Sequence, residues 1–332
     1  MNDPVLVTGA AGFIGMHVCR ALLDKGEAVV GIDNLNDYYS PALKRARIDE
    51  VARHPRADGR FRFETIDVSD ETAIPELFAQ TPFRRVVHLA AQAGVRYSLQ
   101  APLAYARSNL LGMTVMLEAC RHAGTQHLVY ASSSSVYGAD AEVPFAETHR
   151  VDRPISFYAA TKVANEAMAH SYSHLYRLPA TGLRFFTVYG PWGRPDMAVW
   201  LFTEAIAAGR PIRVFAGGEL LRDFTYVDDI VEGVLRVLEH PPGGDGQAPH
   251  AVFNIGNHSP NSVNELIAII ERHTGKQAIR DHQPMQPGDV ERTFADVSRL
   301  AAAVGFRPST PLDVGVQRFV DWYLGYLRRS GG

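Results

Sequence analysis

The chain has few cysteines and little net charge, and each of these features excludes a class of protein. Its 332 residues include only two cysteines, Cys19 and Cys120, which fall inside expected helices without the CxxC spacing of a redox or metal site. We therefore expect both thiols to be packed in the core of a protein from a reducing compartment. The 33 basic and 36 acidic side chains form no dense Lys/Arg block that could follow a nucleic acid or an anionic membrane.

Long hydrophobic runs are missing as well. The chain has no stretch of about twenty apolar residues that could span a bilayer. It opens on the short run Val5-Leu6-Val7, without the charged region and apolar core of a signal peptide. We accordingly expect a cytoplasmic protein without membrane or nucleic-acid partners. We find neither an HxxxH nor an HExxH pattern that would indicate metal ligands, so we also expect no metal site.

The first half of the chain alternates short β-branched runs with longer amphipathic stretches. That rhythm predicts a doubly wound α/β fold, in which a parallel sheet carries helices on both faces. The expected strands are residues 5–8, 28–32, 61–66, 85–89, 127–131 and 180–186. The expected helices are residues 13–25, 71–80, 103–122 and 157–176.

After Gly190 the pattern changes, because turn-rich segments separate shorter helices. These helices are expected at residues 197–208, 227–240, 261–274 and 311–327. We therefore divide the chain into a larger domain of residues 1–190 and a smaller mixed α/β lobe of residues 191–330. Whether later segments return to the larger domain stays open. The Pro-Pro-Gly-Gly run at residues 241–244 predicts a solvent-exposed loop.

Three glycines, Gly9, Gly12 and Gly15, follow the first expected strand and open the first expected helix. Such a turn offers unpaired N–H groups and the positive end of a helix dipole to a pyrophosphate, as in a Rossmann fold. A bare glycine pattern can also be an ordinary helix start, so its context decides. The second expected strand leads into Asp33, whose carboxylate can accept from both ribose hydroxyls and would repel a 2′-phosphate. We therefore predict NAD rather than NADP.

Other predicted cofactor contacts lie at the ends of the following strands. Asp67 and Val68 follow the third strand, where adenine should lie, and the small-residue segment 89–91 follows the fourth. The full predicted set is Gly9, Gly12, Phe13, Ile14, Gly15, Asp33, Asn34, Asp67, Val68, Leu89, Ala90, Ala91, Tyr158 and Lys162.

A candidate catalytic group follows the nucleotide motifs. Tyr158 and Lys162 stand four residues apart on an expected helix, so both project from one face, and serines 132–135 end the fifth expected strand. An ammonium near a phenol favours the phenolate and lowers the tyrosine pKa, which would give a base that works near neutral pH. A Tyr-x-x-x-Lys pair also occurs by chance on many helices. Its place behind a Rossmann half and a strand-end serine favours the catalytic interpretation.

With these motifs the chain resembles, over nearly its full length, the extended short-chain dehydrogenase/reductases of the nucleotide-sugar epimerase and dehydratase group. The resemblance implies a catalytic triad of Ser133, Tyr158 and Lys162, with Ser133 four residues before Tyr137. Phe157 stands where this family usually has proline. The resemblance also implies a homodimer through a four-helix interface of residues 103–122 and 157–176, although core packing explains the same apolar residues.

Two residues before the Val-Tyr-Gly segment separate the reactions of the group. Dehydratases of this group carry an Asp-Glu pair there, and decarboxylases acting on UDP-glucuronate carry a Glu immediately before it. This chain has Ser134 and Ser135 instead, so both eliminating reactions lose their usual acid or base. The resemblance therefore implies epimerisation through transient oxidation at C4 of the sugar.

The segments 33–39, 93–98 and 183–198 resemble those of UDP-glucuronate 4-epimerases. That resemblance suggests that Ser134, Ser135 and Thr187 hydrogen-bond the C6 carboxylate of the sugar. A 4-keto uronic acid is a β-keto acid, and polar contacts that hold its carboxylate out of line with the carbonyl would suppress loss of CO₂. The alternative is that the serine-rich strand end only packs tightly against NAD.

The nucleotide half of the substrate is assigned to arginines. Arg222 resembles the residue that clamps the UDP diphosphate, and Arg194 is expected in the same pocket, with surface charge as the alternative for both. Phe215 is expected against uracil, and the resemblance adds Arg96 and Asp289 to the substrate contacts. Gln286 replaces an arginine of some relatives, which predicts a looser clamp.

Two alternatives to interconversion of UDP-glucuronate and UDP-galacturonate remain open. The first is a UDP-glucose/UDP-galactose-type 4-epimerase for neutral sugars, in which Thr187 and the serine pair would be incidental. The second is a non-catalytic NAD-binding sensor or scaffold, since a fold alone does not fix a function.

Overall fold

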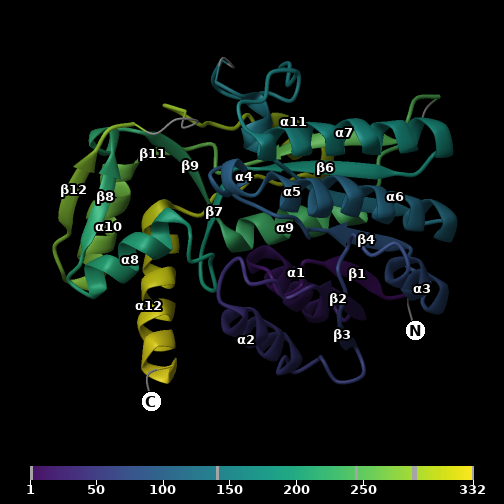
Figure 1. The fold of residues 1–332 in the computed structure, drawn as a ribbon, viewed down its shortest axis with the longest axis horizontal. Helices are drawn as coiled ribbons and strands as arrows, with labels where there is room; N and C mark the ends of the chain where they lie inside the picture. The colour runs from purple at the N-terminus through teal and green to yellow at the C-terminus, as the bar shows by residue number, and fades with distance from the viewer. Residues whose placement is uncertain (1–2, 140–141, 244–245, 286–289, 331–332) are drawn as a thin grey trace.

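The computed structural model describes residues 3–139, 142–243, 246–285 and 290–330 and is built on a seven-stranded parallel sheet (Figure 1). The strand order is β10-β6-β5-β4-β1-β2-β3, so the direction of winding reverses between β1 and β4. The carboxyl ends of these two strands therefore flank the crevice where a doubly wound sheet binds its ligand. The strands are β1 (Val5–Thr8), β2 (Val29–Asp33), β3 (Phe61–Thr65), β4 (Arg85–His88), β5 (His127–Ser133), β6 (Ala180–Phe185) and β10 (His250–Ile255).

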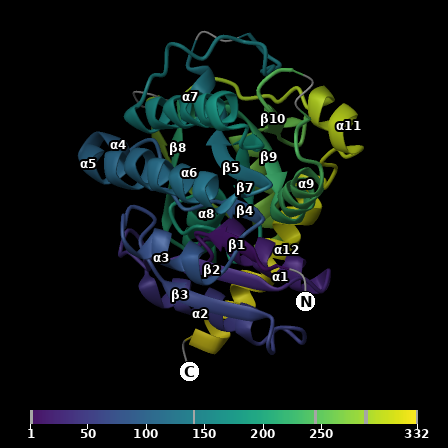
Figure 2. The same cartoon turned by 90° about the vertical axis from the view of Figure 1, so that its right-hand side faces the viewer.

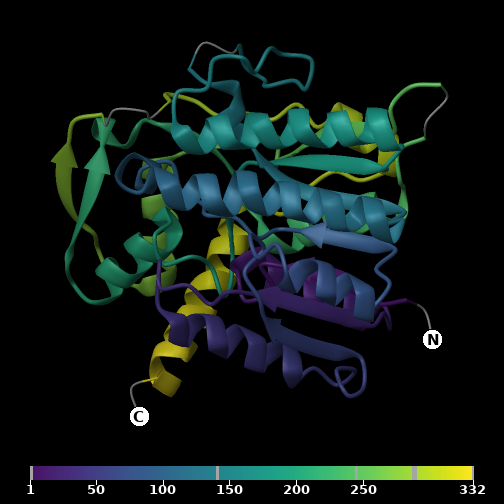
Figure 3. The ribbon, with the colours of Figure 1, turned by 45° about the vertical axis from the view of Figure 1, so that its right-hand side comes forward.

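Helices cover both faces of the sheet, which confirms the doubly wound fold (Figure 2). One face carries α1 (Phe13–Asp24), α2 (Pro41–Ala52) and α9 (Val227–Glu239). The other face carries α3 (Ala73–Gln80), α6 (Gly112–Ala123) and α7 (Phe157–Tyr176), and α6 lies beside α7 (Figure 3). Shorter helical pieces are α4 (Tyr97–Gln100), α5 (Pro102–Tyr105), the π-helix η1 (Ala106–Leu111), the 3₁₀ turns η2 (Ser134–Tyr137) and η3 (Ala216–Gly218), and α11 (Ser298–Val304).

A smaller lobe lies beside the carboxyl ends of the large sheet (Figure 1). It has a three-stranded sheet in the order β11-β9-β7 and a two-stranded sheet of β12 and β8. One buried apolar cluster runs from β1 and α1 into this lobe, so the two parts share a core. The lobe contains β7 (Thr187–Tyr189), β8 (Pro211–Phe215), β9 (Leu221–Tyr226), β11 (Pro260–Ser262), β12 (Ile279–Gln283), α8 (Ala198–Ala207), α10 (Val263–Thr274) and α12 (Leu312–Ser330).

Two helices differ from the expectation. The helix expected over residues 103–122 runs without a gap through α5, η1 and α6, and differs from the expectation in the π-helical stretch of η1. Asn109 lies in η1, and its buried amide bonds the backbone of Gln92 and the hydroxyl of Thr161. The sequence also did not predict α2, because its buried face carries Lys44 and Arg47 among its apolar residues.

Residues beyond 190 return to the large sheet. Strand β10 pairs with β6 in parallel register, and α9 packs on α1. We therefore retain a boundary near residue 190 only as a proposal, with β10 and α9 assigned to the nucleotide-binding domain. Cys19 and Cys120 are buried in α1 and α6, as predicted. Within the described ranges, no helix is both long and apolar enough to cross a membrane.

Candidate active site

The glycine turn between β1 and α1 forms the floor of a cavity of about 240 Å³. Gly9 has a φ of +70°, and a Cβ there would lie 2.8 Å from the backbone nitrogen of Ala90. A Cβ on Gly15 would lie 2.1 Å from the carbonyl oxygen of Gly9. Gly12 starts α1 without a side-chain cap, so the first N–H groups of the helix are left for a ligand.

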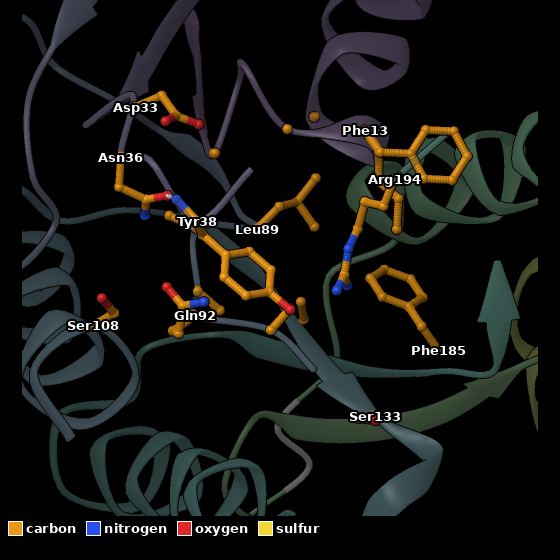
Figure 4. Close-up of a pocket in the computed structure, with 18 of the residues that line it drawn as sticks. Phe13, Asp33, Asn36, Tyr38, Leu89, Gln92, Ser108, Ser133, Phe185 and Arg194 are labelled. Atoms are coloured by element: carbon orange, nitrogen blue, oxygen red, sulfur yellow. Dashed lines mark hydrogen bonds between the residues drawn. The ribbon is translucent and has the colours of Figure 1, made fainter. Parts of the chain in front are cut away.

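Asp33 lies at the far end of this cavity from Ser133 (Figure 4). It ends β2, is 9% exposed, and accepts a hydrogen bond from the Leu35 backbone N–H at 2.8 Å. Burial raises the pKa of the Asp33 carboxyl, while the Leu35 N–H and the Lys44 charge act in the opposite direction. In its ionised form this carboxylate can accept hydrogen bonds from ribose hydroxyls.

All the predicted cofactor residues except Asp67 line this cavity. Asp67 lies behind it and accepts a hydrogen bond from Asn34 Nδ2 at 2.8 Å. Segment 33–39 contributes to the resemblance seen in the sequence, but no residue of that segment after Asn34 is among the predicted cofactor contacts. The structure adds Asn36, Tyr38, Tyr39 and Lys44 to the lining of this cavity. It also adds Gln92, which follows β4, and Ser108 of η1 (Figure 4).

Tyr158 and Lys162 project from α7, which begins after Ser156 because that side chain caps the Ala159 N–H at 3.1 Å. Burial raises the pKa of Tyr158, and a hydrogen bond with Ser133 and the charge of Arg194 oppose that rise. The expectation that Lys162 lowers this pKa is not met. Its Nζ donates to the Ala131 carbonyl at 2.8 Å and lies 5.9 Å from the centroid of the Tyr158 ring.

Lys162 itself is strongly perturbed. Burial lowers its pKa to about 8, and the carboxylate of Glu166 one helical turn later partly offsets this effect. Glu166 is buried and receives two hydrogen bonds from Arg184, at 2.9 and 2.7 Å, and one from Ser132 Oγ at 2.6 Å. The charged form of Lys162 is therefore favoured by a carboxylate that is itself held in a buried ion pair with Arg184.

The four serines at the end of β5 have different surroundings. Ser132 points into the core at Glu166. Ser135 donates both its backbone N–H and its hydroxyl to Ser133 Oγ, at 3.2 and 2.9 Å. Because two donors occupy the Ser133 oxygen, the proton of Ser133 is left to point towards other partners. Ser134 lies on the wall of a second cavity.

This second cavity measures about 830 Å³ and lies between the two parts of the molecule. The predicted substrate residues that the structure describes all line it; Asp289, like Gln286, lies outside the described residues. Those residues are Arg96, Ser134, Ser135, Thr187, Arg194, Phe215 and Arg222. The two cavities share the residues Tyr38, Ser133, Tyr158, Phe185, Phe186, Arg194 and Met197. A ligand in each would therefore meet at the candidate catalytic residues.

Arg194 reaches the shared wall from the loop after β7, opposite Tyr38 (Figure 4). Its guanidinium pairs with Asp196 through Nε and Nη2, at 3.0 and 2.5 Å, and the Tyr38 hydroxyl donates to Asp196 at 3.0 Å. Arg96 lies over the ring of Phe215, with 5.1 Å from its Cζ to the ring centroid. Contacts across the cavities thus join segments from both parts of the chain.

Residues 5–256 match the model of the NAD dependent epimerase/dehydratase family. The chain belongs to this family. It is 49% identical to "UDP-glucuronate 4-epimerase 3" of Arabidopsis thaliana, across 99% of this chain and 77% of that protein.

Solved structures of the family superpose closely on the chain. The UDP-glucuronic acid 4-epimerase of Bacillus cereus, crystallised with UDP-glucuronic acid and NAD, gives a TM-score of 0.88 at 33% identity, covering 97% of this chain and 99% of that one. The UDP-glucose 4-epimerase of Thermotoga maritima, crystallised with UDP-glucose, gives 0.86 at 30% identity, covering 98% and 99%.

The first cavity of this epimerase/dehydratase suits NAD, the family's cofactor. Its glycine turn leaves no room for Cβ atoms at Gly9 and Gly15, and the Asp33 carboxylate on its lining could accept hydrogen bonds from ribose hydroxyls. Within the described ranges, no group of three or more His, Cys, Asp or Glu side chains could hold a metal ion. His170 and His174 do stand four residues apart on α7, a spacing our sequence analysis overlooked.

Proposed function

We propose that this family member is a UDP-glucuronate 4-epimerase that interconverts UDP-glucuronate and UDP-galacturonate. One observation carries the proposal: Ser134, Ser135 and Thr187, three neutral hydroxyl donors, line the same cavity as Tyr158. A carboxylate in that cavity would meet hydroxyl donors where an eliminating enzyme would present an acid. The names and ligands of the similar proteins support the same assignment.

The residues of the shared wall have distinct tasks in this reaction. When bound, NAD supplies the group that accepts and returns the C4 hydride. Tyr158 takes the proton of the sugar O4 as a general base and later returns it. Ser133, whose oxygen accepts from Ser135, has one proton left to donate, either to Tyr158 or to the sugar oxygen. Lys162, with a pKa of about 8, stays cationic at neutral pH on the wall of the cofactor cavity, where its ammonium would bind the nicotinamide ribose.

Epimerisation also requires that the oxidised sugar present its other face before reduction. The substrate cavity, at about 830 Å³, is large enough for a hexuronate to turn while its nucleotide stays bound. Arg222 and Arg194 would hold the diphosphate, and Phe215 and Arg96 would enclose the uridine side. Ser134 and Thr187 would hold the carboxylate away from the alignment that releases CO₂.

A direct assay tests this proposal. The purified protein is incubated separately with UDP-glucuronate and UDP-glucose, and chromatography separates each substrate from its epimer and from any decarboxylated product. We expect UDP-galacturonate as the main product of the first incubation. Faster turnover of UDP-glucose would contradict the carboxylate assignment and favour the neutral-sugar alternative, to which the similarity with the Thermotoga maritima enzyme also points. No turnover of either sugar would favour the non-catalytic alternative.

We further propose a cytoplasmic homodimer. Leu99, Leu103, Leu175 and Tyr176 are 67, 82, 63 and 45% exposed on α4, α5 and α7, on the face where α6 and α7 lie side by side. Burying such side chains against a second copy would remove apolar surface from water. Light scattering of the purified protein measures the mass, and a monomer at micromolar concentration would contradict the dimer.

A further inference from the structure

The described residues include a fully buried arginine whose hydrogen-bond partners are all uncharged. Arg47 of α2 is 0% exposed. Its Nε donates to the Trp192 carbonyl at 3.1 Å, and Nη2 donates to the carbonyls of Trp192 and Gly193 at 2.8 and 2.9 Å. Its Nη1 donates to the Ala11 carbonyl and the Tyr39 hydroxyl, at 3.1 and 2.6 Å. Burying a cation without a carboxylate is costly, so this position needs a reason.

The contacts of Arg47 connect the two cavities. Ala11 belongs to the glycine turn of the cofactor cavity, and Trp192 and Gly193 immediately precede Arg194 of the substrate cavity. One planar guanidinium therefore fixes the substrate loop against the cofactor turn. Lysine could not reproduce this arrangement, because its single ammonium lacks the rigid fork of five donors.

Two further contacts fasten the same loop to the cofactor half. His17 of α1 lies with its Nε2 2.9 Å from the Pro191 carbonyl, and burial lowers the pKa of His17 to about 4, so the neutral ring donates. At the other end of the loop, Tyr38 donates to Asp196 at 3.0 Å. Arg47 lies between these two attachments in the loop and makes the largest number of contacts.

The charge of Arg47 also has an electrostatic effect. Burial raises the pKa of Asp33, and the charge of Arg47 opposes that rise, so the field of Arg47 extends to the cofactor cavity. Within the described ranges no acidic side chain lies within ion-pair distance of it, so a diphosphate bound nearby meets a positive charge that the protein itself has not neutralised. A bound anion would offset the desolvation of this cation.

We propose that Arg47 is a positioning residue that couples NAD retention to UDP-sugar binding. Its fork holds the loop bearing Arg194 in place, and its charge favours the diphosphate of the dinucleotide. The inference rests on the proposed function only in taking a UDP-sugar as the substrate, and it can be tested without any sugar, with NAD and with UDP as probes. Failure of the proposed function would appear as absent turnover, and failure of this inference would appear in binding.

The test compares three variants of the full-length protein. Arg47→Met removes both charge and fork, Arg47→Lys removes the fork, and Arg45→Met changes an exposed arginine on the same helix as a control. NAD retention is measured as the dinucleotide released from the protein over time, and UDP affinity by calorimetry. We expect Arg47→Met to lose NAD and to bind UDP about tenfold less well, since bonds to charged groups are lost. Arg47→Lys should retain more NAD than Arg47→Met but bind UDP as weakly as that variant. Arg45→Met should match the wild type in both NAD retention and UDP affinity.

A double-variant cycle separates positioning from a general loss of structure. If Arg47 acts through the loop of Arg194, Arg194→Ala alone weakens UDP binding and adding Arg47→Lys weakens it little further. Equal losses from Arg47→Lys in both backgrounds would overturn the proposal, as would wild-type UDP affinity in Arg194→Ala. Wild-type NAD retention and UDP affinity in a folded Arg47→Met would overturn it as well. If Arg47→Met fails to fold, the Arg47→Lys cycle still decides.

Discussion

The buried ion pair between Glu166 and Arg184, close to Lys162, allows a quantitative prediction for the substitution Glu166→Gln. Glu166 and Arg184 have side-chain exposures of 9% and 4% and are joined by two hydrogen bonds, at 2.9 and 2.7 Å. The amide keeps the shape of Glu166 but leaves the Arg184 charge buried and unpaired. Removing one partner of such a pair lowers the free energy of unfolding by about 3–5 kcal/mol. Urea denaturation followed by circular dichroism measures the change.

The matched control removes both charges. In Glu166→Gln/Arg184→Met no unpaired ion remains, and Tyr137, which accepts from Arg184, keeps its bond to Asn254 at 2.7 Å. The double variant should therefore be clearly more stable than Glu166→Gln alone. A double variant as unstable as the sum of the two single variants would refute the assignment of the loss to an unpaired charge.

The substitution Glu166→Gln should also shift the pH dependence of kcat/KM in a defined direction. The Glu166 carboxylate raises the pKa of Lys162, which burial lowers to about 8. Without that carboxylate the ammonium is less favoured, so the pKa of Lys162 falls and the lysine loses its proton at lower pH. The alkaline limb of kcat/KM should therefore move below pH 8 in Glu166→Gln. A limb that stays in place or moves upward would show that it does not report Lys162.

Three further exchanges test the site. Tyr158→Phe removes the general base and should lower kcat by about 100- to 10,000-fold while NAD stays bound, as turnover assays and released dinucleotide measure; full activity would refute the mechanism. Ser134→Ala combined with Thr187→Ala should raise formation of UDP-4-keto-pentose, because the carboxylate loses its contacts, and mass spectrometry without this product would count against that role. Asp33→Asn should narrow the preference for NAD over NADP in equilibrium binding, since the repulsive charge is gone; an unchanged ratio would show that another residue selects the cofactor.

Much of the fold could be predicted because its signals are local. The glycine turn, the β-branched strands and the serine cap of α7 each depend on neighbouring residues, and α7 has the expected limits, Phe157–Tyr176. The π-helix could not be predicted, because it depends on Asn109 meeting Gln92 and Thr161 across the structure. Nor could the return of β10 to the large sheet, which depends on pairing with a strand about 70 residues away.

The residues of the candidate site also divide into those with a local sequence signal and those that depend on distant contacts. Gly9, Asp33 and Tyr158 could be predicted as site residues because their spacing relative to strands and helices carries information. Lys44 and Arg47 were missed because charged residues on a helix are normally solvent-exposed, and here both are buried. Their burial comes from contacts with Asn36 and with the loop of residues 190–194, which no local pattern reveals.

The pairing of β10 with β6 has a consequence for how the chain could be divided. A chain ending near residue 190 would contain every strand of the large sheet except β10, and its β6 would become an edge, with the backbone groups that now pair with residues 250–255 unmatched. Such an edge offers a template for a strand of another copy. We therefore expect the isolated first half to associate by pairing at the open edge of β6. We also expect the nucleotide-binding unit to complete its fold only after the last third of the polypeptide has been synthesised.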